Sequence, residues 1–230
     1  MVKEKEKLAF LALWLLAAFL IFYATGCLSE EEAVNEEHDS TDSTHMFDYT
    51  YIGQNIDMSQ GEVSTPLQSY EGCSNKIEVW KEPDPLTHPC NFRLVDQHGN
   101  IVELYDFEGS VIMLDFSTMW CYWCNVAAAH TQEFHDSSES FSVLTILLED
   151  STSDEVDIAD LQAWASSHGI SSAPILAGNS DLIGTNINEW NVSGLPTFFF
   201  IDKNFYVRKL FPGWNQETIT NYISELIAEQ

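Results

Sequence analysis

The motif WCYWC at residues 120–124 places two cysteines two residues apart, directly after the apolar run VIMLDFST. A continuous apolar run of this length is typical of a β-strand that is buried on both faces. The segment from about 122 to 137 is predicted to be helical. A cysteine pair where a buried strand leads into a helix is compatible with half of a zinc site, a structural disulfide or a redox-active dithiol.

Zinc is the least favoured of these three interpretations. A structural zinc ion normally has four protein ligands, so a second CxxC pair or a suitable pair of histidines should accompany the first. His130 and His135 follow on the same predicted helix, and the spacing from Cys124 to His130 matches no usual ligand pattern. We therefore expect no metal and no other cofactor.

The redox interpretation fits the position of the pair. A helix N-terminus offers free N–H groups and the positive end of the helix dipole, and both lower the pKa of a nearby thiol. Cys121 is therefore predicted to be the attacking thiolate. Cys124 lies one turn further along and is predicted to resolve the mixed disulfide. A purely structural disulfide across so short a loop would constrain little chain.

The remaining patterns place this pair in an α/β fold. They predict a hairpin with its turn at Gly99, a second buried strand in FSVLTILLE, a helix from Thr152 to Gly169 with a Thr152/Glu155 capping box, a hairpin in TFFFID and YVRKLFPG, and a final amphipathic helix. This order implies a central mixed β-sheet flanked by helices on both faces, with an N-terminal extension.

The N-terminus resembles a secretory signal, with a lysine-bearing start, an apolar run from Leu8 to Tyr23 and small residues before Cys27. Cys27 is predicted to be a lipidation site; an uncleaved membrane anchor and full release are the alternatives. Four parts follow, namely a signal peptide or membrane anchor over 1–26, an acidic disordered tether over 27–60, an extension packed on the domain over 61–90 and the domain itself over 91–230.

Cys73 and Cys90 remain after the other cysteines are assigned. An extracytoplasmic compartment keeps disulfides oxidised, and the even remainder favours a structural disulfide between them. Two unrelated thiols and a second redox pair are the alternatives.

The net charge is −27, with 9 Lys+Arg against 36 Asp+Glu. A chain this acidic lacks the basic surface that phosphate binding requires, so a nucleic-acid partner is excluded. The same charge argues against docking on anionic lipid headgroups.

Two segments together resemble the thioredoxin superfamily, and within it the membrane-tethered TlpA/ResA-like branch. They are FRLVDQHGNIVELYDFEGSVIMLDFSTMWCYWC and, about seventy residues later, NVSGLPTFFFIDKNFYVRKLFPG. The resemblance covers Asn91 to Gln230. The combination of WCxxC with GLPT at this separation is far more specific than WCxxC alone. Ser117–Met119 depart from the usual Trp-Ala-Thr run of the superfamily, which affects the local surface rather than the fold.

The resemblance implies roles for further residues. Pro196 would be the cis-proline that places the Leu195 backbone against the active-site sulfurs, where a substrate strand can pair. Asp115 would be the buried acid that takes the proton of the resolving thiol. Tyr122 and Trp123 are two bulky aromatics at the start of the predicted helix and offer an apolar surface for a partner. The predicted substrate-binding residues are Trp120, Tyr122, Trp123, Leu195 and Thr197.

The expected function is exchange of the CxxC dithiol or disulfide with extracytoplasmic proteins that contain cysteines. The branch favours a reductant of the cytochrome c maturation type, recharged by a membrane thiol-electron donor, tethered to the membrane and monomeric. A disulfide oxidase or isomerase of the same fold is the first alternative. From other classes, a peroxiredoxin-like peroxidase and a copper-delivery protein remain open, although STMWC lacks the proline of the first and no histidine follows His168 for the second.

Overall fold

The computed structural model describes residues 67–77 and 86–229. The predicted signal segment, the tether, Cys27 and parts of the 61–90 extension lie outside the described residues. Within the described part of the chain, no helix is long and apolar enough to cross a bilayer.

The centre of the domain is a five-stranded sheet in the order β5-β4-β3-β6-β7. Its strands are β3 (Val111–Ser117), β4 (Phe141–Leu147), β5 (Ile175–Ala177), β6 (Thr197–Ile201) and β7 (Val207–Pro212). Strands β3, β4 and β5 run parallel, whereas β6 pairs antiparallel with both β3 and β7. The predicted mixed sheet is confirmed, and β3, which leads to the cysteine pair, is its middle strand.

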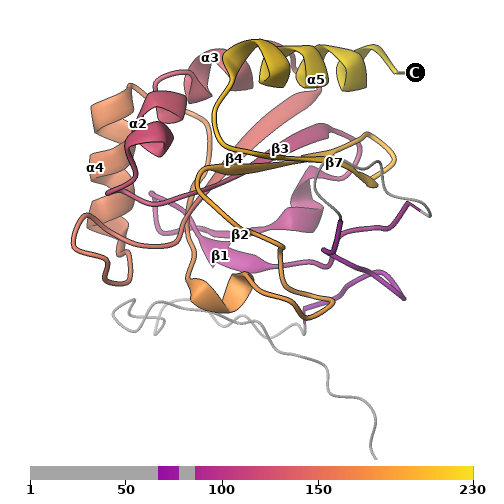
Figure 1. Cartoon of the computed structure of the whole chain (residues 1–230), viewed down its shortest axis with the longest axis horizontal. Helices are drawn as coiled ribbons and strands as arrows, with labels where there is room; N and C mark the ends of the chain where they lie inside the picture. The colour runs from indigo at the N-terminus through magenta and orange to yellow at the C-terminus, as the bar shows by residue number, and fades with distance from the viewer. Residues whose placement is uncertain (1–66, 78–85, 230) are drawn as a thin grey trace, which may run out of the picture. The chain divides into compact units, whose positions relative to one another are not determined.

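Within the described residues, four α-helices pack on one face of this sheet. They are α2 (Tyr122–Ala128), α3 (Thr131–His135), α4 (Ile158–His168) and α5 (Gln216–Ala228). Ala127 of α2, Phe134 of α3 and Ile219 of α5 pack with Met113 of β3 and Phe198 of β6. Figure 1 shows α2, α3 and α5 together on one side of the strands.

Helix α4 continues this layer toward the sheet edge. Leu161 and Trp164 pack with Leu147 of β4 and Ile175 of β5. The chain runs from β3 through α2 to β4 and then through α4 to β5, moving each time toward the same edge of the sheet. Each of these parallel connections is right-handed, so both helices lie on the same face. Helices α2 and α4 therefore lie side by side over β3, β4 and β5.

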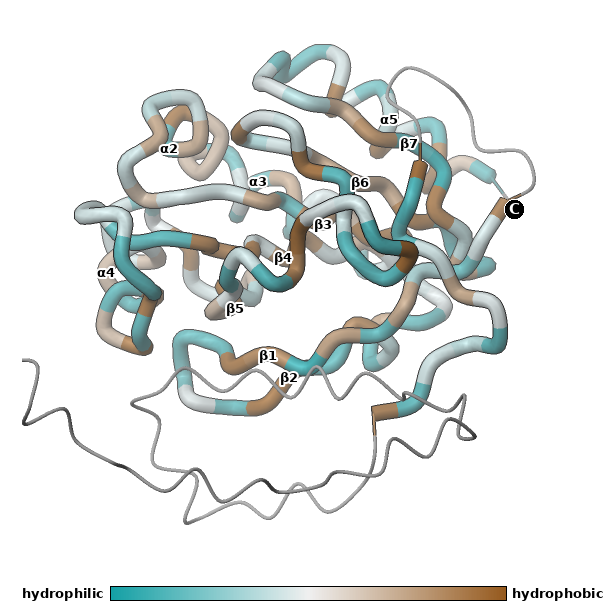
Figure 2. The backbone as a smooth tube through the Cα atoms, turned by 60° about the horizontal axis from the view of Figure 1, so that its bottom comes forward, coloured by the Kyte–Doolittle hydropathy of each residue, from teal (hydrophilic) through white to brown (hydrophobic). Residues whose placement is uncertain are grey.

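The other face is covered by the hairpin of β1 (Arg93–Val95) and β2 (Ile101–Glu103) and by two short 3-10 helices, η2 (Leu104–Phe107) and η3 (Ser180–Leu182). In Figures 1 and 2 the hairpin lies on the side of the sheet away from α5. Leu94, Leu104 and Leu182 pack against Leu114 of β3 in a second cluster. The prediction placed helices on both faces; among the described residues the α-helices cover the first face, and this second face carries the hairpin and the two 3-10 segments.

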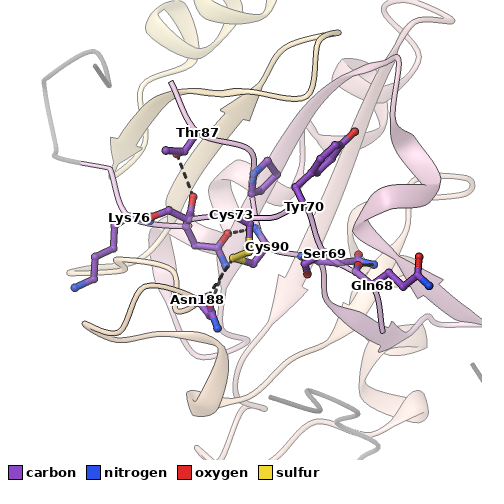
Figure 3. The surroundings of a disulfide bond; sticks show 12 residues. Gln68, Ser69, Tyr70, Cys73, Lys76, Thr87, Cys90 and Asn188 are labelled. Atoms are coloured by element: carbon purple, nitrogen blue, oxygen red, sulfur yellow. Dashed lines mark hydrogen bonds between the residues drawn. A yellow bond between two sulfur atoms is a disulfide. The ribbon is translucent and has the colours of Figure 1, made fainter. Parts of the chain in front are cut away.

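The described part of the extension is fastened to this second face. Cys73 and Cys90 form a disulfide with an S–S distance of 2.01 Å (Figure 3). Asn75 accepts a hydrogen bond from the Cys90 N–H at 2.7 Å and donates one to the carbonyl of Asn188 at 2.6 Å. Ile77 is buried in the second cluster. The extension therefore contributes to the core of the domain.

Three local predictions need revision. The predicted helix over 122–137 is two helices, separated at Ala129 and His130, and the turn stacks the His130 ring on Trp214 at 5.3 Å. Strand β5 was not predicted, because three residues are too few to show a period. It forms through pairing with β4.

The start of α4 also differs from the prediction. Asp157 caps the helix in a reciprocal pair with Asp160, in place of Thr152 with Glu155. The Thr152 hydroxyl instead donates to Asp150 and Asp154 in the preceding turn. Side chains of this type compete for local backbone groups, so a turn can use them before the helix begins. The predicted stop at Gly169 is confirmed, with φ of 66°.

Candidate functional site

The two cysteines of WCYWC lie at the start of α2, directly beyond the end of β3. Cys121 is the N-cap residue, and its Sγ accepts a hydrogen bond from the Cys124 N–H at 3.2 Å. The two side chains form a disulfide, with a Cα–Cα distance of 5.2 Å. Cys124 is completely buried, whereas Cys121 keeps 7% of its surface exposed. A reagent from solution therefore reaches Cys121 first.

Exposed aromatic side chains surround this disulfide. Trp120, Tyr122 and Trp123 have exposed fractions of 52%, 72% and 54%. Trp120 donates a hydrogen bond from Nε1 to Oε2 of Glu149 at 2.6 Å. Monomeric proteins seldom expose several large apolar side chains together unless the patch binds a partner. The predicted substrate-binding aromatics thus lie together on the surface, next to the site.

The loop that carries Pro196 lies against the same cluster. The Leu195–Pro196 peptide bond is cis. Leu195 packs against the hydrophobic cluster that contains both Cys121 and Cys124. Among residues 67–77 and 86–229, neither the N–H nor the C=O of Leu195 has a backbone partner. These groups are available to a peptide strand laid beside the disulfide.

Thr197 has a different position from the other predicted substrate-binding residues. Its side chain is 1% exposed, and its hydroxyl donates to the carbonyl of Gly194 at 2.6 Å. The carbonyl of Pro196 accepts from the Gly213 N–H at 2.7 Å. Thr197 can therefore affect substrate binding only indirectly, by holding the conformation of this loop.

Asp115 lies on β3, on the sheet face that α2 covers. It shares this face with Met113, which packs with Ala127 of α2. Its side chain is 1% exposed, and Oδ1 accepts a hydrogen bond from the Ser117 hydroxyl at 2.6 Å. Burial raises the pKa of Asp115 to about 7, although the hydrogen bond from Ser117 lowers it. At neutral pH this carboxyl group can therefore accept or release a proton.

Sequence reasoning missed Glu149 and the cleft beside it. The cleft has a volume of about 350 Å³, and Thr118, Glu149, Gly194 and Leu195 are among its lining residues. Glu149 follows the second buried strand just as WCxxC follows the first. Because parallel strands end at the same edge of a sheet, this position alone could have brought Glu149 to the site.

The described residues contain no cluster of metal-ligating side chains. Within the described ranges, no group of three or more His, Cys, Asp or Glu side chains could hold a metal ion. The chemistry that the described site offers is that of the two sulfurs and the buried carboxyl group.

Comparison with known proteins agrees with this chemistry. The profile of the AhpC/TSA family matches residues 87–210, more than half of the chain. The chain is 26% identical over 163 residues to the thiol-disulfide oxidoreductase ResA of Bacillus thuringiensis (strain Al Hakam), covering 70% of this chain and 86% of the relative.

Solved structures show the same fold. A secreted thiol-disulfide isomerase from Corynebacterium glutamicum superimposes with a TM-score of 0.55 at 19% identity, covering 70% of this chain and 96% of that one. A thiol:disulfide interchange protein of the thioredoxin family from Chlorobium tepidum TLS gives a TM-score of 0.52 at 17% identity, covering 62% and 97%. The predicted thioredoxin-like fold is confirmed.

Proposed function

The chain belongs to the AhpC/TSA family, and its relatives are thiol-disulfide oxidoreductases. We propose that it reduces disulfides of extracytoplasmic proteins through Cys121 and Cys124. The single observation that carries the proposal is the unequal burial of the two cysteines. Cys121 caps the helix and keeps 7% of its surface exposed, whereas Cys124 is completely buried. This asymmetry supports attack by Cys121 and resolution by Cys124.

In the reduced protein, the Cys121 thiolate attacks one sulfur of a substrate disulfide. A bond forms between Cys121 and that sulfur, and the other substrate sulfur leaves as a thiolate. The N–H of Cys124, which donates to the Cys121 Sγ, would stabilise the attacking thiolate. The substrate strand lies along Leu195, whose free N–H and C=O can pair with it.

Cys124 then loses its proton and attacks Sγ of Cys121. The second substrate thiolate leaves, and the product is the Cys121–Cys124 disulfide together with a reduced substrate. Asp115 is the proposed proton acceptor, because its pKa of about 7 lets it take the Cys124 proton near neutral pH. Two electrons pass to the substrate, so a thiol donor must reduce the pair before the next cycle.

The proposed setting is outside the cytoplasm and tethered to the membrane through the N-terminal segment. The apolar run that ends before Cys27 supports this setting. Its donor would be a membrane thiol-electron carrier, and its substrates would be cysteine-containing proteins such as apocytochromes c. The similarity to the ResA relative supports this branch of the family.

Insulin reduction tests the chemistry. The wild-type protein with a thiol donor should precipitate the insulin chains, and Cys121→Ser should not. Activity that persists in Cys121→Ser would refute the assignment.

The equilibrium of the Cys121–Cys124 pair with a glutathione buffer tests the direction. A reductant gives a potential well below that of the buffer, whereas a pair that glutathione readily reduces is an oxidase or isomerase.

A further inference from the structure

The cleft beside the Pro196 loop is lined by side chains that have no role in the proposed redox chemistry. Its walls combine acidic groups, among them Glu149, Asp154 and Glu155, with apolar ones, among them Leu148, Ile183 and Val192. We propose that this cleft binds a lysine or arginine side chain of the protein substrate whose cysteine is joined to Cys121. The proposal deepens the proposed function and rests on it.

The charge of the cleft favours a cationic occupant. Three carboxylates line it, those of Glu149, Asp154 and Glu155. None of the lysines and arginines in the described part of the chain is among its lining residues. Like charges gathered without a counter-charge repel one another, and a cation that enters the cleft relieves this repulsion.

A buried hydroxyl gives a second and independent indication. Thr118 lines the cleft and is only 1% exposed. Its Oγ1 has no hydrogen-bond partner among the residues that the structure describes. A buried polar atom without a partner is costly, so such groups usually meet a ligand or a water molecule. An oxygen acceptor at this place suits a donor-only group such as an ammonium or a guanidinium.

The apolar walls select an organic cation over a metal ion. Leu148, Ile183 and Val192 line the same cleft as the carboxylates. Lysine and arginine bury an aliphatic stem along apolar surface while the charged end meets polar groups. No set of ligands for a metal ion exists within residues 67–77 and 86–229.

The position of the cleft identifies the source of this side chain. Leu195 lines the cleft and also packs against the cluster that holds Cys121 and Cys124. A substrate strand that pairs with Leu195 therefore runs between the disulfide and the cleft. A basic side chain of this strand, close in sequence to the attacked cysteine, can reach the carboxylates.

The test uses synthetic peptides that contain an internal disulfide and one lysine. The lysine is moved through the positions on either side of the attacked cysteine. Each lysine peptide has a matched peptide with glutamine at the same position. The wild-type protein should reduce the best lysine peptide about fivefold faster in kcat/KM than its glutamine counterpart, as expected for one partly exposed charge pair. The preference should decline with added salt.

Variants locate this preference in the cleft. The double variant Asp154→Asn/Glu155→Gln should lose most of it. Thr118→Val, which keeps the shape and removes the hydroxyl, should reduce it. The matched control is Glu139→Gln, which removes one exposed carboxylate ahead of β4, at the end of that strand opposite to the cleft, and should keep the preference.

Two results would overturn the proposal while leaving the proposed function intact. One is equal reduction of lysine and glutamine peptides at every position. The other is equal loss of preference in Glu139→Gln and the cleft variants, which would assign it to net charge. Failure of the wild-type protein to reduce either peptide or insulin would overturn both proposals.

Discussion

Ser117 donates a hydrogen bond of 2.6 Å from its hydroxyl to Oδ1 of Asp115, and both side chains are buried where β3 approaches the cysteine pair. The two residues are separated by one position on the strand, so their side chains lie on the same face of the sheet. The hydrogen bond favours the carboxylate, but burial outweighs it and raises the pKa of Asp115 to about 7. A group with this pKa can exchange protons with a thiol at neutral pH.

Replacing Asp115 by asparagine should slow resolution of the mixed disulfide without slowing its formation. Asparagine keeps the shape and cannot accept the Cys124 proton, so resolution should fall by roughly 10²-fold near neutral pH, the lower range for loss of a general base. Rapid-mixing kinetics with a fluorescent disulfide substrate separates the two steps. Unchanged resolution rates across the pH range would remove Asp115 from the mechanism.

The same residue should make the stability depend on pH. The ordinary pKa of 3.8 applies in the unfolded chain and about 7 in the folded one. Between these values the folded protein holds a proton that the unfolded chain has lost, so the free energy of unfolding falls as the pH rises through this window. The loss should approach about 4 kcal/mol and be complete above the folded pKa.

Urea unfolding of the wild type and of Asp115→Asn across this window measures the effect. The difference between the two proteins isolates Asp115, because their other titrating groups are the same. The variant should gain stability relative to the wild type as the pH rises. A difference that is independent of pH would contradict the raised pKa.

Replacing Cys124 by serine should trap substrates. Cys121 remains partly exposed and can attack, but no resolving thiol lies behind it. The variant should accumulate mixed disulfides that survive non-reducing electrophoresis and disappear with a reductant. The matched variant Cys121→Ser should trap none, and trapping by that variant would reverse the assigned roles.

Removing Tyr122 and Trp123, the two most exposed aromatics of the described residues, should weaken the binding of protein substrates only. Tyr122 and Trp123 are mostly exposed, so the double alanine variant should change the free energy of unfolding by about 0.5 kcal/mol or less per residue. KM for insulin should rise several-fold, while the rate with a small aromatic disulfide should stay the same.

Ile187→Ala is the control for this surface, because Ile187 is 57% exposed on the segment that pairs with Asn75 of the extension. It should leave KM for insulin unchanged. Equal effects of both changes would mean that exposed apolar area in general sets KM.

The Cys73–Cys90 disulfide should stabilise the fold without taking part in catalysis. The pair closes a loop with a sequence separation of 17, and its removal by a double alanine variant should cost about 3 kcal/mol in the chain-entropy model. The melting temperature should fall by roughly 6–12 °C. Insulin reduction at low temperature should persist. A folded double variant without activity would indicate a second redox pair.

The sequence was sufficient for the main features of the fold and for the site chemistry. The apolar runs of β3 and β4 are long enough to show that both strands are buried. WCxxC and GLPT predicted which two segments meet at the candidate site, and Leu195 does pack against the cluster of Cys121 and Cys124. The break at His130, the cap at Asp157 and strand β5 could not be predicted. Each depends on neighbours that are remote in the chain or on competition among several equivalent side chains.

Local pattern and residue chemistry determined the thioredoxin-like order of elements and the redox pair, because strand period, helix signals and sulfur spacing are properties of short segments. Only the tertiary structure decided what lies around the pair. It brought Glu149 to the Trp120 N–H and Leu195 against the cluster that contains the two cysteines. Among the described residues it left the Thr118 hydroxyl without a partner beside an acidic cleft. Burial and charge in such a site depend on segments brought together from across the chain, and no single segment carries that information.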